Sequence, residues 1–547
     1  MTRFLPVLVF ILLGSSTALA QPVGQLLPAD RPIDQAIDHY IDLQLKAEKI
    51  IPAPLADDAA ILRRLTLDLN GRVPTLSEMQ EYLANSDPDK KTKLVDRLLA
   101  STALHRHNAQ IFYAFLQNQD GPRKKGDKGN PLYDYLLMSL TENRGWDRIF
   151  REIMLPDEKD PKMQGASDFL KSRVKDLNRL AIDTSVMFFG VNVSCAQCHD
   201  HPHVQQWTQD QFYGMKSFFV RTVDAGGFLG ERDFGVVKYT PNKGVEKVSP
   251  IIFLAGNKID VPGMKEPTGE DAKNEKARLG GAGNKKAKAK EPPAPPKFSL
   301  RAKLVETALT QREFFARNIA NRMVHRFFGR GLVMPLDQVH SENAASHPEL
   351  LDWLARDLAE HGYDLRRMMR GIVLSNAYAR SSRWETDKLP DEKLFALAIV
   401  RPLAPMQIAT SLKLVTADPL AWPSERKKLE ERIDAVEKNA SGLANLFPQV
   451  SDNLQIGVAE AMLFANNEGL QKSLLEGAGT LVDRMKQEPD LTKKADLAIR
   501  TVLSRPSRPD EVQVLVGYMQ RRQDRMDAAC QQVVWTLVTS AEFRFNH

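Results

Sequence analysis

The sequence predicts a mainly α protein with two helical domains, separated by a small β insertion and a disordered tether rich in Lys, Ala and Pro. Three observations lead to this fold class. Apolar residues recur at helical spacing before residue 220 and after residue 297. Between these regions, turn residues separate two short runs of β-branched and aromatic side chains. The stretch that follows has glycines, a Lys/Ala run and clustered prolines, a composition that does not support a packed core.

We assign the first helical domain to residues 31–219. The capping box of Thr75 and Glu78 starts one of its helices, and Asn70-Gly71 ends the helix before it. The remaining apolar stripes predict helices at 33–47, 58–69, 94–99 and 176–189. Each stripe is expected to face the core.

The β insertion is assigned to residues 220–262, with strands at 235–239 and 251–254. Residues 263–297 form the predicted disordered linker.

The second helical domain is assigned to residues 298–547. Its first apolar stripe runs from Phe314 to Phe327 and ends at Gly329. Ser346 is expected to cap the next helix, with Pro348 in the first turn and Glu349 completing the capping box. Further helices are predicted at 365–378, 497–503 and 530–543.

Residues 1–20 have the pattern of a secretory signal peptide. Arg3 precedes a short apolar run, and small residues end the segment at Ala18-Leu19-Ala20. This run is too short to span a bilayer, and no later segment has about 18 uninterrupted apolar residues. We therefore expect a soluble mature protein without a transmembrane segment, in the periplasm or otherwise outside the cytoplasm.

The formal net charge of +6 is concentrated outside the predicted domains. Residues 265–297 hold nine Lys or Arg and five Asp or Glu, a net charge of +4, and Arg3 lies in the signal peptide. The two domains are therefore close to neutral. Because binding of nucleic acid phosphates needs a basic face, we expect no nucleic acid partner.

The chemistry of the chain is concentrated in Cys195-Ala196-Gln197-Cys198-His199, a C-x-x-C-H motif. This spacing is typical of covalent haem c attachment: the two thiols bond the haem, and the histidine binds the iron. On one helical turn, Cys195, Cys198 and His199 would share a face. The chain has three cysteines, and the third, Cys530, lies far away in sequence. We therefore expect one haem c per chain.

Two other interpretations of the motif remain open. The cysteines can form a local disulfide, because export leads to an oxidising compartment. Together with His199, His201 or His203 they can instead bind zinc. An ordinary zinc ribbon has a second C-x-x-C pair, which this chain lacks.

A second axial ligand, if the iron has one, must come from elsewhere in the chain. Its candidates are His347 and, slightly behind it, His325, with Met187 and Met215 as the candidate methionines, while water or an open position is an equally good alternative. His201 follows the attachment site too closely to reach the opposite face of the haem, so we expect a hydrogen-bonding role for it. The aromatic residues after the motif, Trp207 among them, are expected either to cover the haem edge or to belong to the core.

Several stretches together have a recognisable pattern. One group comprises 62–75 (LRRLTLDLNGRVPT), 188–202 and 207–214, and a second comprises 321–322, 328–333, 346–352, 375–378 and 540–547. The first group resembles the planctomycete cytochrome c-like domain, and the second resembles the planctomycete-specific C-terminal domain that accompanies it. The resemblance covers nearly the whole mature chain and implies a secreted bacterial protein of largely unknown function. Larger relatives carry a further cytochrome c domain, which this chain lacks.

The function expected from these features is electron transfer, or haem-assisted redox chemistry, outside the cytoplasmic membrane, with a redox partner protein that the sequence does not name. No catalytic motif accompanies the cysteines, so the sequence does not decide whether the protein is an enzyme. The alternative is a secreted binding or assembly protein whose Cys/His cluster is a structural metal site or a disulfide.

Overall fold

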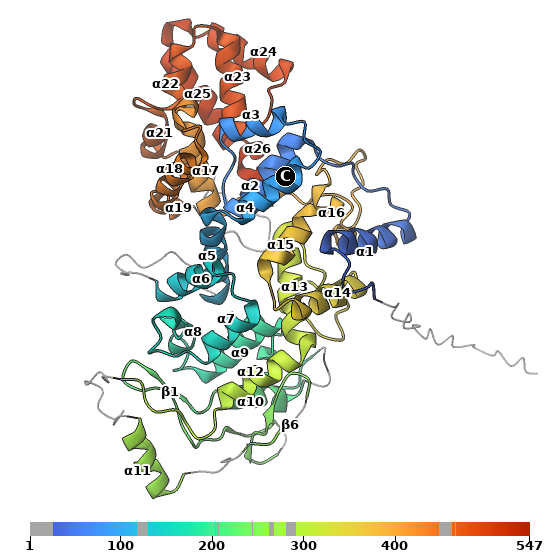
Figure 1. Ribbon diagram of the computed structural model, residues 1–547, viewed down its shortest axis with the longest axis vertical. Coiled ribbons are helices and arrows are strands. Elements are labelled where there is room, and N and C mark those ends of the chain that lie inside the picture. The colour runs from blue at the N-terminus through green and yellow to red at the C-terminus, as the bar shows by residue number, and fades with distance from the viewer. Residues whose placement is uncertain are drawn as a thin grey trace, which may run out of the picture.

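A computed structural model describes residues 26–117, 130–202, 204, 207–242, 244–256, 258–261, 267–279, 291–447, 462–464 and 466–547. The predicted signal peptide, His203 and the Lys/Ala run at 285–290 lie outside the described residues. The protein is mainly helical, as predicted, with small two-stranded sheets (Figure 1). Among the described residues, no helix is both long and apolar enough to cross a membrane.

The first half of the chain is a series of helices on both sides of the cysteine motif. They are α1 (Ile33–Ala47), α2 (Asp58–Asn70), α3 (Leu76–Ala84), α4 (Lys90–Leu99), α5 (Thr102–Gln117), α6 (Pro131–Thr141), α7 (Trp146–Met154), η1 (Pro161–Met163), α8 (Asp168–Lys171), α9 (Leu177–Phe189), η2 (Ser194–Gln197) and α10 (Gln209–Ser217). The predicted capping box of Thr75 and Glu78 is confirmed, and Gly71 ends α2 in the left-handed conformation.

Within its described residues, the β insertion forms three antiparallel two-stranded sheets. They pair β1 (Thr222–Asp224) with β2 (Leu229–Glu231), β3 (Lys238–Tyr239) with β4 (Lys247–Val248), and β5 (Ile251–Ile252) with β6 (Lys258–Ile259). The strands are shorter than predicted. The insertion packs tightly on α10, because a Cβ at Gly214 would lie 2.7 Å from Ile252. It is therefore anchored to the helix that follows the motif.

The second half of the chain is again helical. It contains α12 (Leu300–Thr310), α13 (Arg312–Phe328), α14 (Pro348–Glu360), α15 (Leu365–Leu374), α16 (Asn376–Ala379), η3 (Glu392–Leu394), β7 (Arg401–Pro402), α17 (Pro405–Thr416), η4 (Pro419–Ala421), α18 (Arg426–Lys438), α19 (Ser441–Ala444), α21 (Glu468–Leu475), α22 (Leu481–Gln487), α23 (Leu491–Leu503), α24 (Pro509–Gln520), η5 (Gln523–Arg525), α25 (Met526–Thr539), α26 (Ala541–Arg544) and β8 (Phe545–Asn546). Strands β7 and β8 pair, so the C-terminal residues return to the middle of the molecule, beside α2 (Figure 1).

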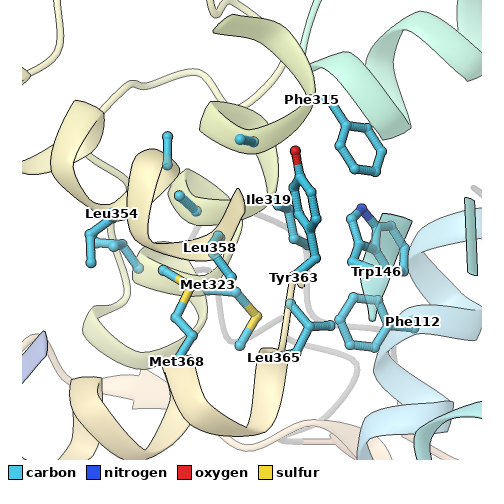
Figure 2. Close-up of a cluster of buried hydrophobic side chains, with 14 of the residues drawn as sticks. Phe112, Trp146, Phe315, Ile319, Met323, Leu354, Leu358, Tyr363, Leu365 and Met368 are labelled. Atoms are coloured by element: carbon cyan, nitrogen blue, oxygen red, sulfur yellow. The ribbon is translucent and has the colours of Figure 1, made fainter. Parts of the chain in front are cut away.

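The main hydrophobic core joins helices from both halves of the chain. It runs from Ile33 to Ala396 and includes residues of the β insertion. In Figure 2, Phe112 and Trp146 lie beside Phe315 and Tyr363, which come from the second half. A second core is built largely from residues 403–543. Residues 300–396 therefore share a core with the first half, whichever domain boundary is drawn.

The structure also differs in three ways from the helices that the sequence predicted. Helix α11 (Gly269–Arg278) lies within the predicted disordered linker; a capping box of Thr268 and Asp271 starts it. The predicted helices 365–378 and 530–543 are divided at Ser375 and Ser540, whose side chains cap α16 and α26. The cap of α14 is His347 rather than Ser346, because the Ser346 hydroxyl bonds the His347 ring instead of the helix.

Candidate functional site

The cysteine motif follows α9 after a sharp turn at Gly190. This residue is left-handed, with φ of 68°, and a Cβ here would lie 2.7 Å from Oδ1 of Asn318. Only glycine fits both the conformation and the space. The turn directs the chain from the buried end of α9 to the surface, where the motif lies.

The motif is a 3₁₀ turn and not the α-helical turn that its spacing suggested. The 3₁₀ helix η2 carries Cys195 and ends at Gln197, so Cys198 and His199 lie beyond it. Cys195, Cys198 and His199 are all exposed, and both thiols are free.

Three side chains hold the end of the motif. The Gln197 carbonyl accepts hydrogen bonds from Nε2 of Gln209 at 3.2 Å and from the hydroxyl of Tyr213 at 3.4 Å. The Cys198 carbonyl accepts one from Nδ2 of Asn242 at 2.6 Å. Gln209 and Tyr213 belong to α10, whereas Asn242 belongs to the β insertion. The insertion therefore helps to set the conformation of the motif.

The ring of Tyr213 joins these two elements. It stacks on Tyr239 of β3, with centroids 4.0 Å apart and planes 14° from parallel. Burial, and after it the nearby Cys198, raises the pKa of Tyr213 above its ordinary value. The phenol therefore stays protonated and keeps its donor for the Gln197 carbonyl at neutral pH.

His199 presents one nitrogen for metal binding. Its Nδ1 lies 2.7 Å from the carbonyl oxygen of Asp200. Because a carbonyl only accepts, Nδ1 carries the proton, and in the neutral ring Nε2 holds the free lone pair. A backbone carbonyl on the other ring nitrogen is the usual partner of a metal-binding histidine.

His201 has the hydrogen-bonding role that we expected. The side chain is buried, and its Nδ1 accepts a hydrogen bond from the backbone N–H of Val204 at 3.1 Å. The ring also meets Trp207 edge-on, with centroids 5.3 Å apart. Through this bond His201 braces the loop after the motif.

The aromatic residues after the motif belong to the core. Trp207, Phe212, Phe218 and Phe219 are all buried in the main hydrophobic cluster. Of the two expectations for these rings, the structure supports the core assignment.

Two side chains from the second half of the chain form hydrogen bonds with the end of α9, the helix before the motif. The amide of Asn318 and the guanidinium of Arg322, both on α13, donate to the carbonyls of Met187 and Val186, at 2.7 and 2.9 Å. These carbonyls lie in the last turn of α9, where helix carbonyls lack partners within the helix. The cationic Arg322 also complements the negative end of the α9 dipole.

Residues 337–340, also from the second half of the chain, contact the residues just before the motif. The backbone N–H of Val339 donates to the Gly190 carbonyl at 2.9 Å, and Gln338 forms an antiparallel bridge with Val191. The ring of His340 lies near those of His201 and Trp207, with centroids 6.1 and 5.4 Å away. Sequence reasoning missed this histidine, since no periodicity or short motif links it to residues 195–199.

The residues predicted as second axial ligands of the iron have contacts with residues other than those of the motif. His347 is 4% exposed; its Nδ1 lies 3.1 Å from the Ser346 hydroxyl, and its ring contacts Phe395. Burial lowers the pKa of His347 to about 4. The backbone carbonyl of His325 accepts from Gly329 at the end of α13. Met187 and Met215 are buried in the main core.

The donor set at the motif fits covalent haem attachment. Two free, exposed thiols are separated by two residues, and the adjacent imidazole has its Nε2 lone pair available. Among the described residues, no group of three or more His, Cys, Asp and Glu side chains is arranged to hold a metal ion by itself.

Comparison with protein families identifies two domains. Residues 36–224 match PSCyt2, described as a protein of unknown function (DUF1549), and residues 301–438 match PSD1, described as a protein of unknown function (DUF1553). No curated protein matches the chain. No solved structure matches it either. The cysteine motif lies in the PSCyt2 region, while Asn318, Arg322 and His340 lie in the PSD1 region. The chain therefore belongs to the proteins that carry a PSCyt2 domain followed by a PSD1 domain.

Proposed function

We propose that this protein is an exported c-type haem protein that carries one covalent haem c. Thioether bonds from Cys195 and Cys198 would hold the haem, and Nε2 of His199 would bind the iron. The proposed function is electron transfer, or haem-assisted redox chemistry, outside the cytoplasmic membrane. The signal-peptide pattern of residues 1–20 supports this location.

One observation supports the proposal: the reactive side chains of the motif are exposed to solvent, while hydrogen bonds hold its backbone in place. The thiols and the imidazole are exposed, whereas the carbonyls of Gln197 and Cys198 are hydrogen-bonded to neighbouring elements. A structural disulfide or a core cysteine has no need of this exposure. Thiols that bond a haem must be accessible to it.

Attachment is a balanced addition. Each thiol S–H adds across one vinyl group, so that an S–C bond forms at one vinyl carbon and the proton goes to the other. The addition needs no external oxidant. Once bound, the haem supplies one-electron redox chemistry, with a potential that depends on the axial ligands. His199 would keep its Nε2 aimed outward through the bond between Nδ1 and Asp200.

The second axial position is a separate part of the proposal. The sequence singled out His347, but the contacts of that residue are with Ser346 and Phe395. A histidine that the sequence did not single out, His340, lies beside His201 and Trp207, and its Nε2 is 3.1 Å from Oε1 of Gln338. We therefore keep His347 as a candidate and add His340 beside it. If His340 is the ligand, His340→Ala changes the spin state of the iron and His347→Ala does not.

The test is expression with the natural signal peptide in a host that has haem-ligation machinery. After acid–acetone extraction, the pellet should retain haem and give the pyridine haemochrome spectrum of thioether-bound haem. The double variant Cys195→Ser/Cys198→Ser should lose it, and Cys530→Ser, the matched control, should retain it. Haem that extracts completely, or stoichiometric zinc without haem, would refute the proposal and favour a secreted binding or assembly protein with a structural Cys/His site.

A further inference from the structure

We propose that Asp337 is a positioning residue for the cysteine motif, so that the PSD1 region completes a site that lies in the PSCyt2 region. Asp337 would act through Asn192, three residues before Cys195. The inference deepens the proposed function, since it concerns the same motif, but it can be tested on the protein without haem.

Asn192 connects Asp337 to the motif through three hydrogen bonds. Its backbone N–H donates to the Asp337 carbonyl at 2.8 Å, and its Nδ2 donates to the Asp337 carboxylate at 3.0 Å. Its Oδ1 in turn accepts from the backbone N–H of Ser194 at 3.1 Å. Ser194 is the first residue of η2, and Cys195 is the second. The Asn192 side chain therefore satisfies a free donor at the start of the turn that holds Cys195.

The orientation of the Asn192 amide depends on the carboxylate of Asp337. An amide has two distinct ends, and the carboxylate accepts only from the NH₂ end. This fixes the oxygen end toward Ser194. Without the carboxylate, the amide can rotate and release the Ser194 N–H.

Asp337 is itself well held. Its neighbours Gln338 and Val339 run antiparallel to 190–191, through the bridge to Val191 and the 2.9 Å bond to the Gly190 carbonyl. The PSD1 region thus adds a short strand-like segment beside the chain that enters the motif. The same region holds the end of α9 through Asn318 and Arg322.

Different residues form hydrogen bonds with the two ends of the motif. The proposal can therefore be tested by comparing the effects of substitutions on Cys195 and on Cys198. Asp337, through Asn192, supports the start of η2 and hence Cys195. Asn242, on the other side, supports the carbonyl of Cys198. Loss of Asp337 should therefore affect Cys195 more than Cys198, and loss of Asn242 should have the opposite effect.

The experiment uses the chain without residues 1–20, produced in a reducing cytoplasm so that the thiols stay free. Iodoacetamide labelling is followed by mass spectrometry, with fragmentation to separate Cys195 from Cys198. Cys530, which is 0% exposed, serves as an internal reference for folding. In Asp337→Ala the labelling rate of Cys195 relative to Cys198 should change roughly fivefold, the factor that corresponds to one lost hydrogen bond of about 1 kcal/mol.

Asp337→Asn is the matched variant. Its side-chain oxygen can accept the same bond from Asn192, so its labelling ratio should stay close to that of the wild type, and Asn242→Ala should change the ratio in the opposite direction. An unchanged ratio in Asp337→Ala, with Cys530 unlabelled, would overturn the proposal. If Asp337→Ala exposes Cys530, Asn192→Ala is used instead, since it removes the acceptor for Ser194 directly and should change the labelling ratio in the same direction; an unchanged ratio would then overturn the proposal.

The outcome is independent of haem. A changed ratio in a protein that never acquires haem would refute the proposed function and leave the positioning role in place. In a haem-bearing protein, Asp337→Ala should also shift the reduction potential, whereas Asp337→Asn should leave the potential close to that of the wild type. If Asp337→Ala leaves the labelling ratio unchanged and the protein carries covalent haem, the positioning role of Asp337 is refuted and the haem proposal stands.

Discussion

Mild acid should destabilise the protein through two buried histidines, His107 and His347. Burial, and then the charge of Arg326, lowers the pKa of His107 to about 3, and burial lowers that of His347 to about 4. In the unfolded chain both rings regain an ordinary pKa near 6.5. Between these values the unfolded state binds protons that the folded state does not. The stability is therefore fully present above about pH 6.5 and is lost as the pH falls toward the folded pKa values.

The size of the loss follows from these pKa values. At pH 5 the unfolded ring is almost fully protonated and the folded ring is almost fully neutral. Linkage then gives a loss of about 2 kcal/mol for each histidine relative to pH 7.5, or about 4 kcal/mol for the pair.

The assay compares the wild type with His347→Asn in urea unfolding at pH 7.5 and pH 5. Asn is a preferred residue at the N-cap that His347 occupies, and it does not titrate. Lowering the pH from 7.5 to 5 should reduce the free energy of unfolding of the wild type by about 2 kcal/mol more than that of His347→Asn. Ser346→Ala, which removes the hydroxyl beside Nδ1 but keeps the imidazole, should retain the wild-type pH dependence. A difference between wild type and His347→Asn that is the same at both pH values would refute the reasoning.

Three further predictions concern stability and domain association. Glu78, whose pKa is lowered to about 2 in a buried pair with Arg72, should be intolerant of substitution: Glu78→Gln leaves the guanidinium without its counter-charge and should cost about 3–5 kcal/mol in urea unfolding. Gly371→Ala should lower the melting temperature, because the new Cβ would lie 2.3 Å from Cβ of Ile33 and overpacking of this kind costs about 1–3 kcal/mol; an unchanged melting temperature would show that α1 and α15 can separate freely. Limited trypsin digestion should cut first within residues 263–297, as their composition predicts, and the fragments should co-elute because the main core contains residues from both sides; first cleavage within α5 or α13 would contradict this.

The helices were predictable where one local signal marks each boundary. Helix α1 has the predicted bounds, because its apolar stripe is complete from Ile33 to Leu45. Helices α2 and α13 end at Gly71 and Gly329, the left-handed glycines that the sequence indicated. The start of α11 had an equally clear signal in Thr268 and Asp271, but the surrounding composition outweighed it.

The candidate site was predictable only in its chemical groups. Cys195, Cys198 and His199 follow from the motif, whereas the shape of the motif depends on Asn242, which lies 44 residues from Cys198 in sequence. The contacts of Asp337 and His340 span still longer separations and come from irregular backbone. No periodic pattern predicts such contacts, since they arise from packing between distant elements.

Three of the segments that carry the family resemblance meet away from the motif, around one buried carboxylate. Asp68 accepts hydrogen bonds from the Tyr378 hydroxyl and from Nδ2 of Asn546, both at 2.8 Å, and forms an ion pair with Arg401 at 2.9 Å. Asp68, Tyr378 and Asn546 belong to three different stretches of that resemblance. A buried carboxylate must have all its partners, since removing one leaves an uncompensated charge in the core. These three stretches are therefore constrained by the fold itself, and their resemblance to a family says how the chain packs. Evidence about function has to come from the exposed cysteine motif and from the residues of both regions that hold it.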